Sequence, residues 1–209
     1  MIYGNSQLKE ERNRKMKARN SKLNIATAFT IIASILLVLA LPAPTLADNE
    51  CRLDQRQMQH PGAIVFGGKT VLGQTFIPSA PGKHVCQVKV FIRKNFAAAG
   101  NLTLHLLRSN FTELDAAVTI PGGAIPMGNS VQAFDFGCNG AVLAGMPFYG
   151  LKLESRNSPA GAYSWLGSGG NVYVRPGADV RGWRNISAGN GNWESLGGWD
   201  YAFEIYMCN

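Results

Sequence analysis

Short strand-like runs separated by glycine, proline and asparagine constrain the fold of this chain more than any other feature. No helical period of any length appears after residue 47. The runs are GQTFIP (73–78), VCQVKVFIRK (85–94), LTLHLLR (102–108), SVQAFDF (130–136), PFYGLKLE (147–154), YSWLG (163–167) and YAFEIYMC (201–208). Many short strands with this punctuation predict an all-β fold, either a sandwich or a barrel.

The alternation of side chains predicts which face of two runs is buried. In the run 85–94 one face carries Cys86, Val88, Val90 and Ile92, and the other carries Gln87, Lys89 and Arg93. In the run 201–208 the two sets are Phe203, Ile205 and Met207 against Ala202, Glu204 and Tyr206. Both patterns are typical of half-buried strands. The segments 120–129 and 167–179 are too rich in proline and glycine for a ladder, so we expect loops there.

The first part of the chain is predicted to be a targeting segment. A basic n-region (1–22), an apolar h-region (23–41) and a small-residue junction ending at Ala47 describe a secretory signal peptide. Two prolines, Pro42 and Pro44, would disrupt the end of a permanent membrane helix, so we expect cleavage after Ala47. The apolar run is close to the ~18 residues of a spanning helix, so an uncleaved membrane anchor remains the alternative.

The distribution of charge separates this segment from the rest of the chain. The net charge is +7, and the first 22 residues hold seven basic and two acidic groups, which leaves +2 for the remainder. A nucleic-acid binder needs its basic patch on the folded domain, so this class of partner is not expected. The predicted mature part, 48–209, has the length of one domain. We expect it to be secreted, either periplasmic or extracellular, and to meet a membrane only through an uncleaved signal segment.

The four cysteines all follow the predicted cleavage site, and an even number in an exported chain predicts two disulfides. The side-chain parity of Cys86 and Cys138 favours a bridge between them inside the sandwich. Domain termini often lie close together, which favours a second bridge between Cys51 and Cys208. A Cys86–Cys208 pair stays open as an alternative. No CxxC motif or Cys/His cluster occurs, so we expect no metal site.

Several of these runs, taken in order, resemble a known type of domain. The order GQTFIP, VKVFIRK, LTLHLL, AFDF, LAGMPFYGLKLE, NVYVRPGADVRGW and WDYAFEIY is similar to jelly-roll modules of secreted bacterial proteins, whose architecture resembles that of carbohydrate-binding modules. The resemblance covers about 53–207, and its most specific parts are Gly145-x-x-x-Tyr149-x-Leu151 and Asp200-x-x-Phe203. It implies a jelly-roll-like antiparallel β-sandwich without catalytic residues in these motifs. The four cysteines depart from the pattern.

Aromatic residues in the last third of the chain are the candidate ligand-binding residues. They are Trp165, Tyr173, Trp183, Trp193 and Trp199. Aromatic rings on a loop can stack on sugar faces, because they offer a large apolar area with few rotatable bonds. The alternative is that these rings pack into the core. This alternative is favoured for Trp165 and Trp199, because they flank strands. Trp183 and Trp193 lie in loop-like sequence, so they are the stronger surface candidates.

Catalytic residues are harder to assign. The carboxylates Glu113, Asp115, Asp135, Glu154, Asp179, Glu194 and Asp200 are scattered, whereas a glycosidase needs a facing pair. The three histidines, His60, His84 and His105, accompany no GxSxG elbow, and we expect His105 on a strand surface. No DxDxDG-like run supports calcium, although loop oxygens could hold a structural ion. We therefore expect no enzyme and no cofactor.

The function expected from these observations is that of a non-enzymatic extracellular binding or surface module, with a glycan or envelope polymer as its ligand. This rests on analogy between folds and on the aromatic C-terminal third of the chain. A structural or protein-interaction component of the cell envelope is the first alternative. A small hydrolase is the second, and it would require two carboxylates that converge in a cleft.

Overall fold

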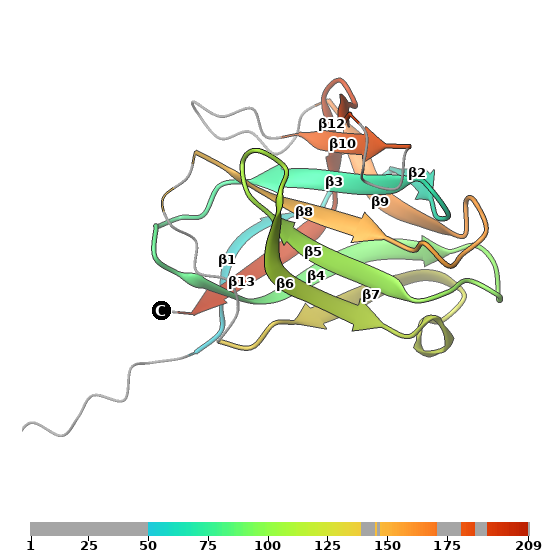
Figure 1. Ribbon diagram of the computed structural model, residues 1–209, viewed down its shortest axis with the longest axis horizontal. Coiled ribbons are helices and arrows are strands. Elements are labelled where there is room, and N and C mark those ends of the chain that lie inside the picture. The colour runs from blue at the N-terminus through green and yellow to red at the C-terminus, as the bar shows by residue number, and fades with distance from the viewer. Residues whose placement is uncertain (1–49, 139–144, 146, 171–180, 187–191, 209) are drawn as a thin grey trace, which may run out of the picture. The chain divides into compact units, whose positions relative to one another are not determined.

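The protein is an all-β domain built from two antiparallel sheets packed face to face, which confirms the fold class expected from the sequence (Figure 1). The computed structural model describes residues 50–138, 145, 147–170, 181–186 and 192–208. These residues belong to one compact unit, Ala47–Asn209, with its own hydrophobic core. A unit with a core of its own meets the criterion for independent folding. The predicted signal peptide lies outside the described residues and stays a prediction.

The strands follow the expected runs closely. In chain order the elements are β1 (Arg52–Gln57), β2 (Gly62–Phe66), β3 (Val71–Phe76), β4 (His84–Lys94), β5 (Leu102–Leu107), β6 (Glu113–Ile120), η1 (Gly122–Ala124), β7 (Gly128–Asp135), β8 (Tyr149–Glu154), β9 (Tyr163–Gly169), β10 (Gly182–Asn185), β11 (Glu194–Ser195), β12 (Trp199–Tyr201) and β13 (Phe203–Cys208). The seven expected runs correspond to β3, β4, β5, β7, β8, β9 and the pair β12 and β13. The strands β1, β2, β6, β10 and β11 were not predicted.

The long strand β4 organises the seven-stranded sheet. β7 pairs along one edge of β4, while β13 and β9 share its other edge, with Val90 opposite Phe203 and Ile92 opposite Trp165. Beyond them, β1 pairs with β13, β2 pairs with β9, and β12 also pairs with β9. The first and last strands of the domain are therefore neighbours, as the proximity of domain termini predicts.

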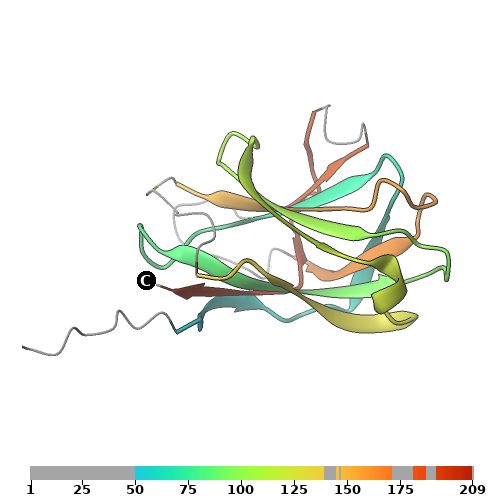
Figure 2. The same cartoon turned by 60° about the horizontal axis from the view of Figure 1, so that its bottom comes forward.

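The second sheet has six strands in the order β11-β10-β3-β8-β5-β6. The two sheets form separate layers, with β3, β5 and β8 in one layer and β4, β7 and β13 in the other (Figure 2). Each sheet buries one face against the other, as expected for strands with apolar residues at alternate positions. The outer face of the six-stranded sheet is the surface on which the candidate site lies.

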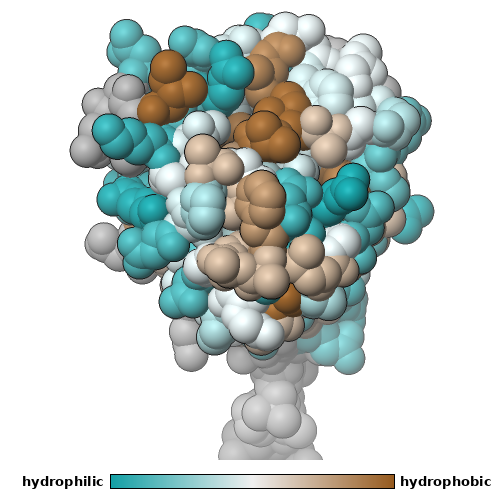
Figure 3. Space-filling model, turned by 90° about the vertical axis from the view of Figure 1, so that its right-hand side faces the viewer, coloured by the Kyte–Doolittle hydropathy of each residue, from teal (hydrophilic) through white to brown (hydrophobic). Residues whose placement is uncertain are grey.

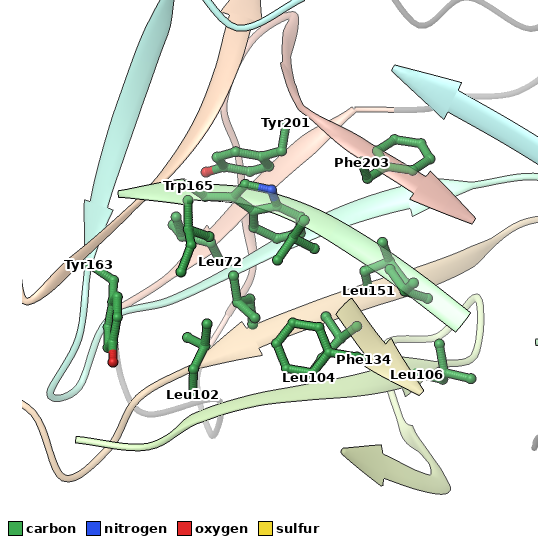
Figure 4. Close-up of a cluster of buried hydrophobic side chains, with 14 of the residues drawn as sticks. Leu72, Leu102, Leu104, Leu106, Phe134, Leu151, Tyr163, Trp165, Tyr201 and Phe203 are labelled. Atoms are coloured by element: carbon green, nitrogen blue, oxygen red, sulfur yellow. The ribbon is translucent and has the colours of Figure 1, made fainter. Parts of the chain in front are cut away.

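The core between the sheets is built from alternate residues of nearly every long strand (Figure 4). Its members include Leu72, Leu102, Leu104, Leu106, Phe134, Leu151, Tyr163, Trp165, Tyr201 and Phe203. The expected core face of the last strand is confirmed, because Phe203, Ile205 and Met207 are buried in this cluster and Glu204 and Tyr206 are not. Rings of this size each remove a large apolar area from water.

The expected disulfide pairing is wrong. The bridges are Cys51–Cys86 and Cys138–Cys208, in place of Cys51–Cys208 and Cys86–Cys138. All four cysteines lie at one end of the seven-stranded sheet: Arg52 is opposite Met207, Cys208 is opposite His84, and Phe136 donates its backbone N–H to Cys86. Proximity therefore permits several pairings.

Parity misleads here because the register shifts between Tyr206 and Met207. Gln87 pairs with Tyr206 and Val85 pairs with Met207, so Cys86 lies in a bulge. Val85 and Cys86 are both buried although they are consecutive, which simple alternation does not allow. Val85 takes the core position, and Cys86 does not continue the face of Val88 and Val90.

The disulfides bear on the compartment in which the domain folds. Both bridges lie within the domain, and none of the described cysteines is free. Disulfides form and persist in oxidising, extracytoplasmic compartments, which agrees with the expected location. Among the residues that the structure describes, no helix has the length and apolar character needed to cross a membrane.

Candidate ligand-binding site

Trp165, one of the candidate residues, belongs to the interior. Its side chain is fully buried in the core (Figure 4). The indole Nε1 donates a hydrogen bond of 3.0 Å to the carbonyl of Ala202, and the ring stacks on Tyr201 at 4.5 Å between centroids. A buried tryptophan whose N–H is satisfied within the protein is a core residue.

Trp199 also packs inward. Its ring is half-buried and meets Tyr201 edge-on at 6.3 Å between centroids. Three glycines leave room for it: an added Cβ would lie 2.7 Å from its Cη2 at Gly62, 2.7 Å from its Nε1 at Gly167 and 3.2 Å from its Cδ1 at Gly182. The ring thus fills the junction of β2, β9 and β10. Tyr173, the remaining tyrosine candidate, lies outside the described residues.

Trp183 and Trp193 lie on the outer face of the six-stranded sheet. Trp183 is directly opposite Gly73 of β3, and a Cβ on Gly73 would come within 2.9 Å of Cζ3 of Trp193. Directly opposed residues of neighbouring strands share a face of the sheet. Gly73 faces outward, because its neighbour Leu72 is in the core. The missing side chain of Gly73 therefore gives the Trp193 ring a place against the sheet.

Two phenylalanines join these tryptophans. Phe111 lies at the centre, with ring centroids 5.0 Å from Trp183, 5.5 Å from Trp193 and 6.3 Å from Phe148. All four side chains are half-buried, so each keeps part of its surface open to solvent. We call Phe111, Phe148, Trp183 and Trp193 the aromatic cluster. Sequence reasoning missed both phenylalanines, because they lie in the β5–β6 turn and directly before β8, far from the tryptophans along the chain.

The turn that carries Phe111 is tightly held. The backbone N–H of Phe111 donates to Arg108, that of Arg108 donates to Thr112, and the side chain of Asn110 accepts from Thr112 at 3.1 and 2.7 Å. Among the described residues, Phe111 alone combines a side chain with a positive φ, of 62°. This left-handed conformation costs a non-glycine residue about 1 kcal/mol or more. This strained conformation places the Phe111 ring over the sheet. A strained residue in such a position points to a role for its ring.

A ring of four ionisable side chains lies beside the aromatic cluster on the same face. Lys152 Nζ contacts Glu113 and lies 3.0 Å from Glu154, while His105 Nε2 is 3.1 Å from Glu154 and His105 Nδ1 is 3.2 Å from Glu113. We call these four residues the charged ring. Outside the ring, Arg156 also contacts Glu154, at 3.1 Å. Glu113 is the most exposed of the four, at 48%, so its carboxylate can accept hydrogen bonds from hydroxyl groups of a ligand.

Strand register joins the cluster to the ring. A continuous row of directly opposed residues crosses four strands, from Trp183 of β10 through Gly73 of β3 and Lys152 of β8 to His105 of β5. Four strands span about 14 Å between the outer two. Apolar rings at one end of this row and charged groups at the other form an amphipathic surface of the width of a few sugar units.

The charged ring holds both of its carboxylates in the ionised form. Burial alone would raise the pKa of Glu154, but the hydrogen bonds from His105 and Lys152 outweigh it and lower the pKa to about 2. Burial acts in the same way on Glu113, and the hydrogen bond from Lys152 together with the charge of His105 lowers its pKa below 4.5. Two ionised carboxylates can accept hydrogen bonds, but neither can serve as a general acid at neutral pH.

The other candidate groups do not form a site of their own in the described part of the chain. His60 stacks on Phe91 at 5.5 Å on the opposite sheet, and Glu194 pairs with Arg184. Asp200 is buried and accepts a hydrogen bond of 3.2 Å from Gln74, so it holds the two sheets together. Asp179 lies outside the described residues. Across the described ranges, no group of three or more His, Cys, Asp or Glu side chains is placed to bind a metal.

Comparisons with known proteins assign no family, because no protein-family model and no curated protein matches this chain.

Proposed function

We propose that the domain is a non-enzymatic extracytoplasmic binding module, and that the outer face of its six-stranded sheet takes a glycan or envelope polymer. The observation that supports this most is the row that links the aromatic cluster to the charged ring. A sugar ring has apolar C–H faces and hydroxyl edges. The faces would stack on Trp183 and Trp193, and the hydroxyls would bond to the exposed side chains of Glu113 and Arg156 beside the buried part of the charged ring.

Topology adds support for the finer fold type. Successive strands from β7 to β10 alternate between the two sheets. This crossing pattern and the sequence resemblance support a jelly-roll, the architecture shared with carbohydrate-binding modules. Since one fold serves many functions, the ligand class rests on the site itself.

A hydrolytic role is less favoured by the same residues. A glycosidase needs one carboxyl group with a raised pKa as proton donor and one ionised partner. In the charged ring the pKa values of Glu113 and Glu154 are both lowered. Two carboxyl groups whose pKa values are both lowered suit ligand binding and sheet stabilisation better than acid catalysis.

Tryptophan fluorescence during titration with soluble polysaccharides tests this proposal. We expect a saturable spectral change with wild-type protein and a five- to thirtyfold loss of affinity in Trp193→Ala, because one aromatic stacking contact contributes about 1–2 kcal/mol. Phe91→Ala is the matched control, since Phe91 is a half-buried aromatic residue on the outer face of the other sheet. It should bind as wild type does. A flat response from folded, oxidised protein across the panel would refute the proposal and direct the search to protein partners.

A further inference from the structure

Four connections form one end of the sandwich, seen at the right of Figure 1. They are β2–β3 (67–70), β4–β5 (95–101), β6–β7 (121–127) and β8–β9 (155–162). We call them the loop end. The disulfides lie at the opposite end of the seven-stranded sheet, and the aromatic cluster is built around the β5–β6 turn and the start of β8. The loop end is therefore separate from the aromatic cluster, and it borders the charged ring at Arg156, which contacts Glu154.

Hydrogen bonds between the loops make the loop end a defined surface. Asn95 N donates to Ala162 O at 2.9 Å, Tyr163 Oη donates to Gly100 O at 2.7 Å, and Gly68 N donates to Ser155 O at 3.0 Å. The buried ammonium of Lys94 donates to the carbonyls of Gly122 at 2.7 Å and Ile125 at 3.1 Å. Loops held in this way present their tips without the entropic cost of ordering them on binding.

The tips of these loops are apolar and exposed. Phe96 is 48% exposed and Met127 is 56% exposed. Smaller apolar residues lie next to them or in the neighbouring loop. The exposed neighbours are Ala97, Ala98, Pro126, Pro159 and Ala160. Figure 3, which views the molecule from this side, shows hydrophobic side chains in a band across the face with hydrophilic ones around it. An apolar surface of this kind on an exported domain points to an interaction site.

The loop end carries positive charge and no acidic residue. The segments 61–70, 91–101, 119–131 and 155–169 contain no Asp or Glu. Lys69 and Arg93 are exposed there, and the buried ammonium of Lys94 has carbonyl oxygens as its described partners. Arg156 is exposed as well and is paired with Glu154. The charge of this end is complementary to an anionic surface.

We propose that the loop end docks on an anionic lipid bilayer. Exposed apolar side chains at loop tips enter the boundary between headgroups and acyl chains, and adjacent lysine and arginine side chains bind the anionic headgroups. Phe96 and Met127 supply the first contribution, and Lys69 and Arg93 supply the second. This surface is distinct from the aromatic cluster, so the domain would hold a polymer close to a membrane.

Flotation with phospholipid vesicles tests the docking surface. The protein used is the independently folded domain from residue 48 onward, which lacks the apolar segment. We expect it to float with vesicles of phosphatidylcholine and phosphatidylglycerol (about 7:3), to float poorly with phosphatidylcholine alone, and to be released by about 0.5 M salt.

Two double variants separate the apolar and the charged contributions. Phe96→Ser with Met127→Ser should weaken binding to anionic vesicles by a factor of about ten or more, because two apolar side chains no longer enter the membrane. Lys69→Gln with Arg93→Gln should weaken it about fivefold per residue removed. The matched control is Leu53→Ser with Met58→Ser, which removes hydrophobic side chains of similar exposure (45% and 41%) outside the loop end and should leave binding unchanged.

Three results would overturn the proposal. The first is absence of flotation by wild-type protein with anionic vesicles. The second is an equal loss in the Leu53/Met58 control. The third is a monomer–dimer equilibrium in sedimentation velocity that only the Phe96/Met127 variant abolishes, which would assign this end to self-association. Circular dichroism and the thermal midpoint confirm that each variant is folded.

Discussion

Replacement of Lys152 by methionine tests the energetics of the charged ring. The ammonium is 3% exposed and lies between Glu113, which is 48% exposed, and Glu154, which is 10% exposed. Methionine keeps most of the length and apolar stem of lysine, so the substitution removes the charge with little change in packing. Glu154 then keeps His105 and Arg156 but loses its most buried partner.

The magnitude follows from the pKa of Glu154. A decrease from 4.5 to about 2 corresponds to about 3 kcal/mol of stability, shared among its partners. Because the folded-state pKa is lowered, this contribution is complete above pH 4.5 and is lost as the pH falls towards about 2. We expect Lys152→Met to reduce the free energy of unfolding by about 1–2 kcal/mol at pH 7, since His105 and Arg156 keep their share, and by less than half of that at pH 3.

Urea denaturation at constant ionic strength measures this difference, with the disulfides intact at each pH. Lys89→Met is the control, since Lys89 is 32% exposed and contacts Glu204 at 3.6 Å and Tyr206 on the other sheet. A partly exposed pair at this distance contributes less than about 1 kcal/mol. If Lys152→Met destabilises the protein equally at pH 7 and pH 3, the cost lies in packing, and the electrostatic reasoning is wrong.

Two further predictions concern the bridges and the aromatic cluster. Replacing Cys138 and Cys208 together by serine should lower the free energy of unfolding by about 4 kcal/mol, because their separation of 70 residues sets a large loop entropy; a non-reducing peptide map that shows Cys51 bonded to any cysteine other than Cys86 would contradict the pairing. Gly73→Ala should displace the Trp193 ring, which a Cβ would approach to 2.9 Å, and weaken glycan binding, whereas Gly123→Ala meets open space and should not.

Much of the fold could be predicted from the sequence because most long strands alternate regularly. The run 201–208 placed Phe203, Ile205 and Met207 in the core, as the structure does. The strand β1, with the sequence RLDQRQ, was missed because it has one large apolar residue and lies at the edge of a sheet, where burial imposes no pattern. Backbone pairing with β13, and not a pattern in its own sequence, holds β1 in the sheet.

The candidate site was predicted only in part, because its residues lie far apart along the chain. The tryptophans were recognised by residue type, but Trp183, which was expected in a loop, lies in β10, and both Trp183 and Trp193 are half-buried on the outer face of the sheet. The charged ring joins residues of β5, β6 and β8, and no local signal links them. His105 lies on the outer face of its strand, as expected, but it is largely buried there between Glu113 and Glu154. Strand order, which decides that they meet, was the missing information.

The pairing of β1 with β13 has a consequence for biogenesis. The first described strand of the domain hydrogen-bonds to the last one, and Cys138 must wait for Cys208. Synthesis proceeds in one direction, so the seven-stranded sheet cannot be completed until β13 has been made. All strands of the six-stranded sheet are made before β13, so the seven-stranded sheet and the Cys138–Cys208 bridge are the last parts of the domain that can be completed.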